Sequence, residues 1–308
     1  MNRCKNYCLV SVLVILLLLN HCQKTVYTYD DQSPQITSEP VVLETTDSTA
    51  TIFWEMNEAC HAQIKYGKTT KYDLVYTVTE NRQIHTVTLT GLEPYTLYHF
   101  KVYNWDFAKN GPVKSDDLTL HTLHNEYSLL REGWRCYTAG QLDSARIFYT
   151  EALGRNALLP EIQAAFGWLD LCIGDIDSAR KAFAQAYSLN PAEPVTLSGL
   201  ATLAMIDNNP AQAINYLSQI LTVSPTWQYA YYAPLNYKRL RLQLAEAYFQ
   251  TAQYDKAQQQ LDLVWPANGL NPNIPATWKV SGTTYPDYAA ALFAAISYCT
   301  KNLAKRIG

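Results

Sequence analysis

The sequence of 308 residues has little charge and no excess of charge of one sign. Charged residues make up 17% of the chain, hydrophobic residues 48%, and the formal net charge is -3. Because Lys and Arg are not in excess, we expect no basic surface for phosphate backbones and no nucleic-acid partner. The apolar fraction excludes disorder of the whole chain, and the length suits about two domains.

Metal-binding patterns are missing as well. The seven cysteines include no C-x-x-C pair, and no Cys/His cluster has zinc spacing. Four histidines, at positions 61, 85, 99 and 121, fall in or beside expected strands, where we expect exposed sheet positions rather than ligands. We therefore expect no metal and no cofactor. For the cysteines at positions 60, 136, 172 and 299, both free thiols and disulfides stay open.

Catalytic motifs are absent from the chain. It contains no G-x-S-x-G, no H-E-x-x-H and no phosphate-binding G-x-x-x-x-G-K. The acid pairs at 30–31 and 116–117 fall in expected loops or strand edges, where solvation explains them. The sequence therefore predicts a protein that is not an enzyme.

An apolar run near the N-terminus, residues 9–19, is broken only by Ser11 and follows the basic residues Arg3 and Lys5. A membrane-spanning helix needs about 20 apolar residues. The segment is therefore typical of a secretory signal peptide, which we place at residues 1–21. A transmembrane anchor is the alternative.

The end of this segment, residues 19–22 (LNHC), resembles the lipobox of bacterial lipoproteins. The resemblance implies that Cys22 becomes a lipidated N-terminus and that the protein is anchored in the cell envelope, periplasmic or on the cell surface. Asn20 and His21 depart from the small residues of that pattern, so simple cleavage, with Cys22 incidental, is the alternative. Residues 22–33 are polar and are expected to form a tether.

Between residues 34 and 123, apolar and polar residues alternate. One series contains Ala50, Ile52, Trp54 and Met56. A period of two places such residues on one face of a strand. Several short runs of this kind, separated by polar turn clusters, predict a β-sandwich.

Residues 92–98 (LEPYTLY) resemble the L-x-P-x-T-x-Y signature of fibronectin type III domains. The resemblance implies that Trp54 is the core tryptophan of the second strand and that Tyr98 forms the tyrosine corner. Residues 105–115 are similar to the sandwich that precedes some secreted metallophosphoesterases. No phosphoesterase domain follows here, so the resemblance brings no catalysis.

Beyond residue 124 the apolar period becomes helical and the sequence repeats itself. The tetrapeptide DSAR at 143–146 recurs at 177–180, 34 residues later, and Gly133 and Tyr149 recur as Gly167 and Phe183. This pattern resembles the tetratricopeptide repeat family, which implies antiparallel helix pairs stacked into a solenoid. The predicted fold is thus multidomain β + α, a fibronectin type III β-sandwich followed by an α-helical tetratricopeptide-repeat solenoid.

The solenoid is expected to span residues 125–266 with about four repeats. The alanine at 257 follows that at 213 by 44 residues instead of 34, which predicts an insertion at 226–238. Residues 267–308 are expected to form a loop and a C-terminal capping helix, because a solenoid otherwise ends on an exposed apolar face.

In the family, the first helices of the repeats line a groove that receives a peptide or a helix of a partner. Carrying the repeat spacing over places the following residues in the groove: Tyr127, Leu130, Trp134, Tyr137, Trp168, Leu171, Met205, Arg239, Glu246 and Phe249. Trp134 and Trp168 would form an aromatic platform of the kind common at binding hot spots. Packing of these residues against each other or against the capping helix is the alternative.

The insertion is a second candidate because it is rich in aromatic residues. These are Trp227, Tyr229, Tyr231, Tyr232 and Tyr237. On an exposed loop such rings would contact protein or glycan, whereas in an extended helix they would be buried. The sequence therefore predicts a non-catalytic, exported and lipid-anchored adaptor that binds a protein partner. A glycan-binding accessory component of a cell-surface uptake or degradation system is the alternative.

Overall fold

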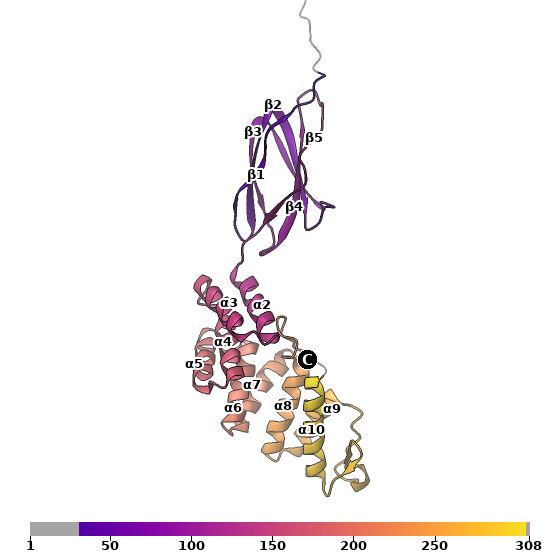
Figure 1. Cartoon of the computed structure of the whole chain (residues 1–308). Helices are drawn as coiled ribbons and strands as arrows, with labels where there is room; N and C mark the ends of the chain where they lie inside the picture. The colour runs from indigo at the N-terminus through magenta and orange to yellow at the C-terminus, as the bar shows by residue number, and fades with distance from the viewer. Residues whose placement is uncertain (1–30, 306–308) are drawn as a thin grey trace, which may run out of the picture. The chain divides into compact units, whose positions relative to one another are not determined.

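The computed structural model describes residues 31–305, which form two compact units. The first unit consists of residues 31–92 and 96–121, and the second of residues 93–95 and 122–305. Strands β1–β6 belong to the first unit and helices α2–α10 to the second (Figure 1). The predicted signal peptide, Cys22 and the start of the tether lie outside the described residues, so those expectations stay predictions.

The first unit is built from six strands that pair antiparallel. They are β1 (Ile36–Thr45), β2 (Thr49–Gly67), β3 (Leu74–Thr90), β4 (Leu97–Trp105), β5 (Val113–Lys114) and β6 (Leu118–His121). The first half of β2 pairs with β1 and with the second half of β3. The second half of β2 pairs with the first half of β3 and with β4, which also pairs with β5 and β6. The N-terminal β region predicted by the alternating pattern is thus present.

The alternation along β2 produces the core of this unit. Ala50, Ile52, Trp54 and Met56 are each 0% exposed. The indole N–H of Trp54 donates to the side-chain oxygen of Asn104 at 3.0 Å, so the largest core residue also has its polar atom satisfied.

His85 differs from the expectation that the strand histidines lie exposed. Its side chain is 1% exposed and stacks on Trp54 with ring centroids 4.6 Å apart. His85 is buried because alternate residues of a strand share a side, and its side chain lies on the same side of β3 as the buried Val87 and Leu89. Burial lowers the pKa of His85 below its ordinary value of 6.5.

This burial predicts a pH dependence for the β unit. In the unfolded chain the imidazole titrates near 6.5, whereas in the fold it stays neutral to lower pH. As pH falls below about 6.5, the unfolded state binds a proton that the folded state does not, and the free energy of unfolding decreases. Above that pH His85 is neutral in both states, so it does not change the free energy of unfolding. Urea unfolding at pH 7.5 and pH 5.5 measures the difference.

The variant His85→Phe is the control for this prediction. Phe keeps an aromatic ring against Trp54 but has no titrating nitrogen, so the part of the pH dependence due to residue 85 should disappear. An identical pH dependence in the variant and the parent would show that His85 is not its source.

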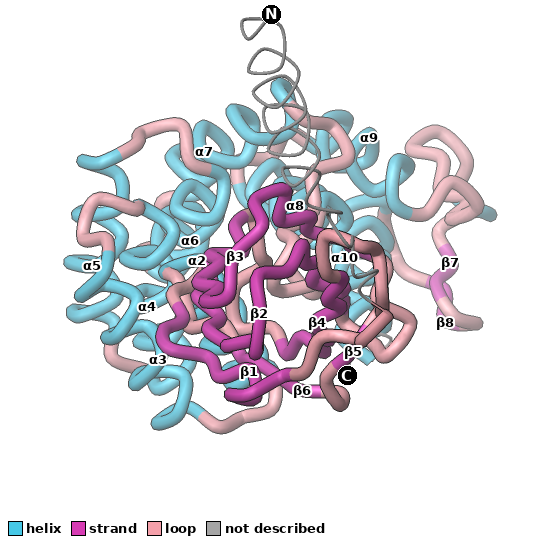
Figure 2. Tube along the Cα trace, turned by 90° about the horizontal axis from the view of Figure 1, so that it is seen from above, coloured by secondary structure: helices cyan, strands magenta, loops and turns pink. Residues whose placement is uncertain are grey.

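The second unit is mainly helical (Figure 2). Its elements are α2 (Glu126–Thr138), α3 (Leu142–Arg155), α4 (Pro160–Ile173), α5 (Ile176–Leu189), α6 (Pro194–Ile206), α7 (Pro210–Val223), α8 (Tyr237–Gln250), α9 (Tyr254–Val264), the short 3-10 helix η1 (Pro275–Thr277), β7 (Lys279–Val280), β8 (Thr283–Thr284) and α10 (Tyr288–Lys305). Helices α2 to α9 pack as consecutive pairs, and each pair also contacts the next.

One turn recurs inside every pair and follows the sequence repeat. The left-handed position is occupied by Gly140, Gly174, Asn208 and Ala252, with φ of 73°, 83°, 54° and 56°. After each of these residues, the next N–H donates back to a carbonyl five residues earlier, a Schellman-type helix end. The four bonds are Gln141 N to Cys136 O, Asp175 N to Asp170 O, Asn209 N to Ala204 O and Gln253 N to Tyr248 O, at 2.8–2.9 Å. The backbone therefore repeats with the spacing that the sequence shows.

Small residues allow the paired helices to approach each other closely. A Cβ on Gly133 would lie 2.2 Å from the ring of Tyr149, and a Cβ on Gly167 would lie 2.7 Å from the ring of Phe183. Both rings are 0% exposed. The repeated glycine and aromatic residue are thus two sides of one contact, which explains their shared spacing.

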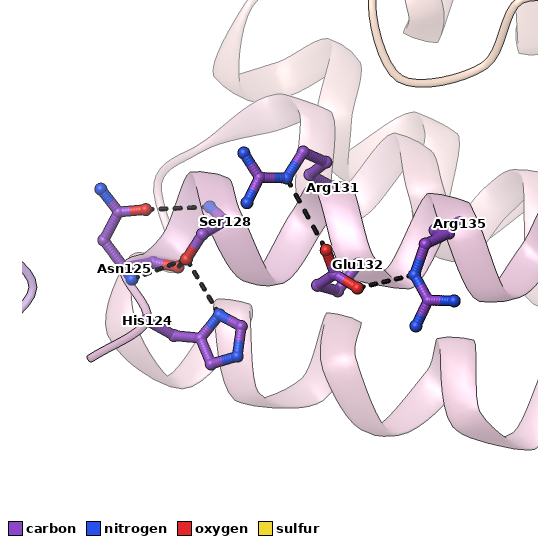
Figure 3. A network of polar contacts seen from close by, with 6 residues as sticks. All are labelled: His124, Asn125, Ser128, Arg131, Glu132 and Arg135. Atoms are coloured by element: carbon purple, nitrogen blue, oxygen red, sulfur yellow. Dashed lines mark hydrogen bonds and ion pairs between the residues drawn. The ribbon is translucent and has the colours of Figure 1, made fainter. Parts of the chain in front are cut away.

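A polar network defines the start of the helical unit (Figure 3). The side chain of Asn125 accepts from the backbone N–H of Ser128, and the Ser128 hydroxyl accepts from the N–H of Asn125, each at 2.9 Å. This capping box satisfies two amide groups that the first turn of α2 would otherwise leave unpaired. Further along α2, Glu132 forms ion pairs with Arg131 and Arg135.

The far end of the unit is closed by α10. This helix packs on α8 and α9, and its Leu292 and Ile296 share a core with Leu242 and Leu261. Among residues 31–305, no helix is both long enough and apolar enough to cross a membrane. The cysteines at 60, 136, 172 and 299 are free thiols in this structure.

Candidate protein-binding face

The first helices of the four pairs, α2, α4, α6 and α8, carry the residues that the repeat spacing assigns to a groove. We call the side of these helices that bears the predicted residues the inner face. Tyr127 is 48% exposed at one end of it. The half-buried members are Tyr137, Leu171, Met205, Arg239, Glu246 and Phe249.

Three predicted residues of the inner face are buried. Leu130 is 1%, Trp134 0% and Trp168 4% exposed. The indole N–H of Trp168 donates to the carbonyl oxygen of Val195 at 3.3 Å, and the guanidinium of Arg239 lies 5.6 Å from its ring centroid. Trp134 and Trp168 therefore do not form an aromatic platform open to solvent. The binding role assigned to the accessible positions stays a prediction.

The insertion is what covers Trp134. Residues 224–236 leave α7, fold back beside α2 and return to α8 (Figure 1). Tyr232 stacks on Trp134 with ring centroids 5.3 Å apart, and Tyr229 meets the same indole edge-on, also at 5.3 Å. Tyr137 completes the cluster, with its ring centroid 5.3 Å from that of Tyr232.

The insertion is neither the exposed loop nor the helix that the sequence suggested. Tyr229 is 8% and Leu235 0% exposed, while Trp227, Tyr231, Tyr232 and Tyr237 are half-buried. Its conformation is a narrow hairpin, in which the Tyr229 N–H donates to Leu235 O at 3.0 Å and the Tyr237 N–H to Trp227 O at 2.7 Å. Its aromatic rings therefore pack mainly against this chain, and no observation here favours a glycan.

Burial controls the electrostatics of the inner face. It raises the pKa of the Tyr137, Tyr149 and Tyr229 phenols, and for Tyr229 the nearby Glu193 and Glu161 raise it further. Burial also raises the pKa of Glu193, although its carboxylate accepts from the N–H groups of Val195 and Thr196. These phenols, buried around Trp134, therefore stay neutral, which suits the aromatic packing seen there.

Glu161 and Glu193, which lie near Tyr229, were not predicted from the sequence. Glu193 is the N-cap of α6 and is 5% exposed, while Glu161 lies in the first turn of α4. A signal was present, since Glu193 and Pro194 together mark a helix start. Within residues 31–305, no three His, Cys, Asp or Glu side chains are arranged to hold a metal ion.

Comparison with known proteins identifies part of the helical unit. Residues 204–274 match the family model described as tetratricopeptide repeat. No curated protein matches the chain.

Similar solved structures cover somewhat more than half of the chain at low identity. PilW, described as a widely conserved type IV pilus biogenesis factor, is 17% identical over 59% of this chain and 77% of that one, with a TM-score of 0.43. YrrB, described as a tetratricopeptide repeat protein with an unusual peptide-binding site, is 15% identical over 59% and 91%, with a TM-score of 0.39. A thermophilic protein of this kind from Thermus thermophilus is 19% identical over 59% and 96%, with a TM-score of 0.39. With the family match and the recurring helix-pair turn, the second unit is a tetratricopeptide-like helical solenoid.

Proposed function

We propose that this protein is a non-catalytic adaptor whose helical solenoid binds a protein partner, and that it is exported and anchored through a lipid on Cys22. The observation that supports the adaptor role most is the recurring helix pair, because stacked pairs present side chains of successive repeats on one continuous face. The solvent-accessible residues of the inner face are the contact positions in this proposal.

The first unit is, in this proposal, a fibronectin type III sandwich that serves as a spacer or a second contact. Its strand pairing supports this assignment, because β2 pairs with β1 along its first half and with β4 along its second half, while β3 lies beside β2 throughout. The positions of Trp54 and Tyr98, 0% and 3% exposed, fit the core tryptophan and the tyrosine corner of that family.

A photocrosslinking experiment tests the proposal in cells. Benzoylphenylalanine replaces Tyr127 on the inner face or, as the matched control, Tyr187 on α5, which is 37% exposed. We expect a discrete crosslinked product with one protein from position 127 and none from position 187. Equal products from both positions, or none from position 127 in a folded protein, would contradict a partner on the inner face.

The same cells test the anchor. The crosslinked product should sediment with membranes when Cys22 is present and move to the soluble fraction in a Cys22→Ser strain. A product that stays with membranes in that strain would contradict lipidation at Cys22.

A further inference from the structure

The insertion resembles a bound peptide more than a connecting loop. Its two ends already meet at its base, since Gln228 and Asn236 face each other in an antiparallel bridge. Its middle, by contrast, reaches Trp134 on α2, the first helix of the solenoid. The short gap between α7 and α8 does not require this excursion, so the contact with the inner face needs another explanation.

The base of the insertion is held by interactions separate from those of its middle. The side chain of Asn236 caps α8 by accepting from the N–H groups of Lys238 and Arg239. The bond from Tyr237 N to Trp227 O closes the base of the hairpin. Both interactions lie at the base, so the start of α8 does not depend on where residues 229–235 lie.

The contact is rich in aromatic packing but poor in hydrogen bonds. Two buried polar atoms near it, Tyr149 Oη and Glu161 Oε2, have no hydrogen-bond partner. Unpaired buried polar atoms cost stability. A segment that offered partners to these atoms would hold the same face more tightly than the insertion does.

We propose that residues 229–235, the middle of the insertion, are a displaceable internal ligand of the inner face. This inference rests on the proposed function and specifies its partner. The partner presents an extended peptide with two aromatic residues three positions apart and an aliphatic residue three positions further on. These match Tyr229, Tyr232 and Leu235 of the insertion, and the partner competes with them for Trp134 and Tyr137.

The insertion itself supplies the probe for the test. A fluorescently labelled synthetic peptide with the sequence of residues 226–238 is titrated into the mature full chain. It is also titrated into a full-chain variant in which residues 229–235 are replaced by Asn-Gly, a two-residue turn that suits the facing pair Gln228 and Asn236. The control peptide carries Ala at the positions of Tyr229, Tyr232 and Leu235.

We expect saturable binding of the native peptide to the shortened variant and roughly tenfold or more weaker binding to the full chain. The tethered insertion competes at an effective concentration on the order of millimolar, which explains the difference. The control peptide should bind neither protein. A full-chain Tyr232→Ala variant, whose insertion loses its stacking on Trp134, should bind the native peptide with intermediate affinity.

Three results would overturn the proposal. They are equal affinity of the native peptide for the full chain and the shortened variant, equal affinity of the native and control peptides, and a folded shortened variant that binds no peptide. If the shortened variant unfolds, recovery of its helical circular dichroism on adding native peptide supports the proposal. No recovery would show that the insertion is a fixed part of the core and would contradict the proposal. Failure here with a crosslink from position 127 would refute the internal ligand and leave the adaptor function standing.

Discussion

Replacing Phe183 with Ala is expected to lower the free energy of unfolding of the helical unit by about 3–5 kcal/mol. The ring is 0% exposed and lies against Gly167, while a Cβ on Gly199 would approach it to 2.1 Å. It also meets Trp168 edge-on, with ring centroids 6.0 Å apart. Because two of its neighbours are glycines, they have no side chains that could move to fill the cavity.

The matched control is Tyr187→Ala, one helical turn further along α5. That ring is 37% exposed and packs edge-on against Tyr216 at 6.4 Å, so we expect a loss of about 1 kcal/mol or less. Urea unfolding followed by circular dichroism at 222 nm measures both variants. Losses of equal size would mean that the glycine-lined contact of Phe183 does not hold neighbouring repeats together.

The features that the sequence predicted well are local and repeated. Gly133 and Gly167 recur with the rings of Tyr149 and Phe183 at the spacing of the helix pairs, because each pair makes the same close contact. Gly199 was not predicted because it does not follow the 34-residue spacing of Gly133 and Gly167. Its contact joins one repeat to the next, and only the structure shows which helix face lies against Phe183.

The path of the insertion could not be predicted for a related reason. Its stacking on Trp134 joins residues far apart in the sequence, and a cluster of tyrosines is compatible with an exposed loop, a helix or a buried hairpin. Local propensity does not separate these outcomes. His85 is different, since its parity with Val87 and Leu89 was visible in the sequence and already indicated a buried position.

The burial of Trp134 and Trp168 changes how a binding experiment has to be designed. Replacing both with Ala would remove 0% and 4% exposed core residues, so any loss of partner binding would follow from lost folding. Accessible positions such as Tyr127, or the insertion itself, test recognition without removing the core.

The first unit should depend on Trp54 as strongly as the second depends on Phe183. Trp54→Ala is expected to cost about 3–5 kcal/mol. The indole fills the centre of the β core, stacks on His85 and donates to Asn104 at 3.0 Å. Its removal leaves a cavity, and it leaves the buried side-chain oxygen of Asn104 without this donor.

Hydrogen exchange with mass spectrometry can measure this loss locally, because peptides from β2 and β4 report on the β core separately from peptides of α4 to α7. We expect the protection factors of the strands to fall roughly a hundredfold or more. A loss of about 1.4 kcal/mol in the free energy of unfolding lowers a protection factor tenfold. Trp105→Ala is the control, because that half-buried ring on β4 packs on Tyr103 at 6.4 Å outside the main core. Unchanged protection in Trp54→Ala, or an equal fall in Trp105→Ala, would contradict the central role of Trp54. A fall in protection confined to the strands would show that Trp54, through His85 and Asn104, organises the core of the β unit.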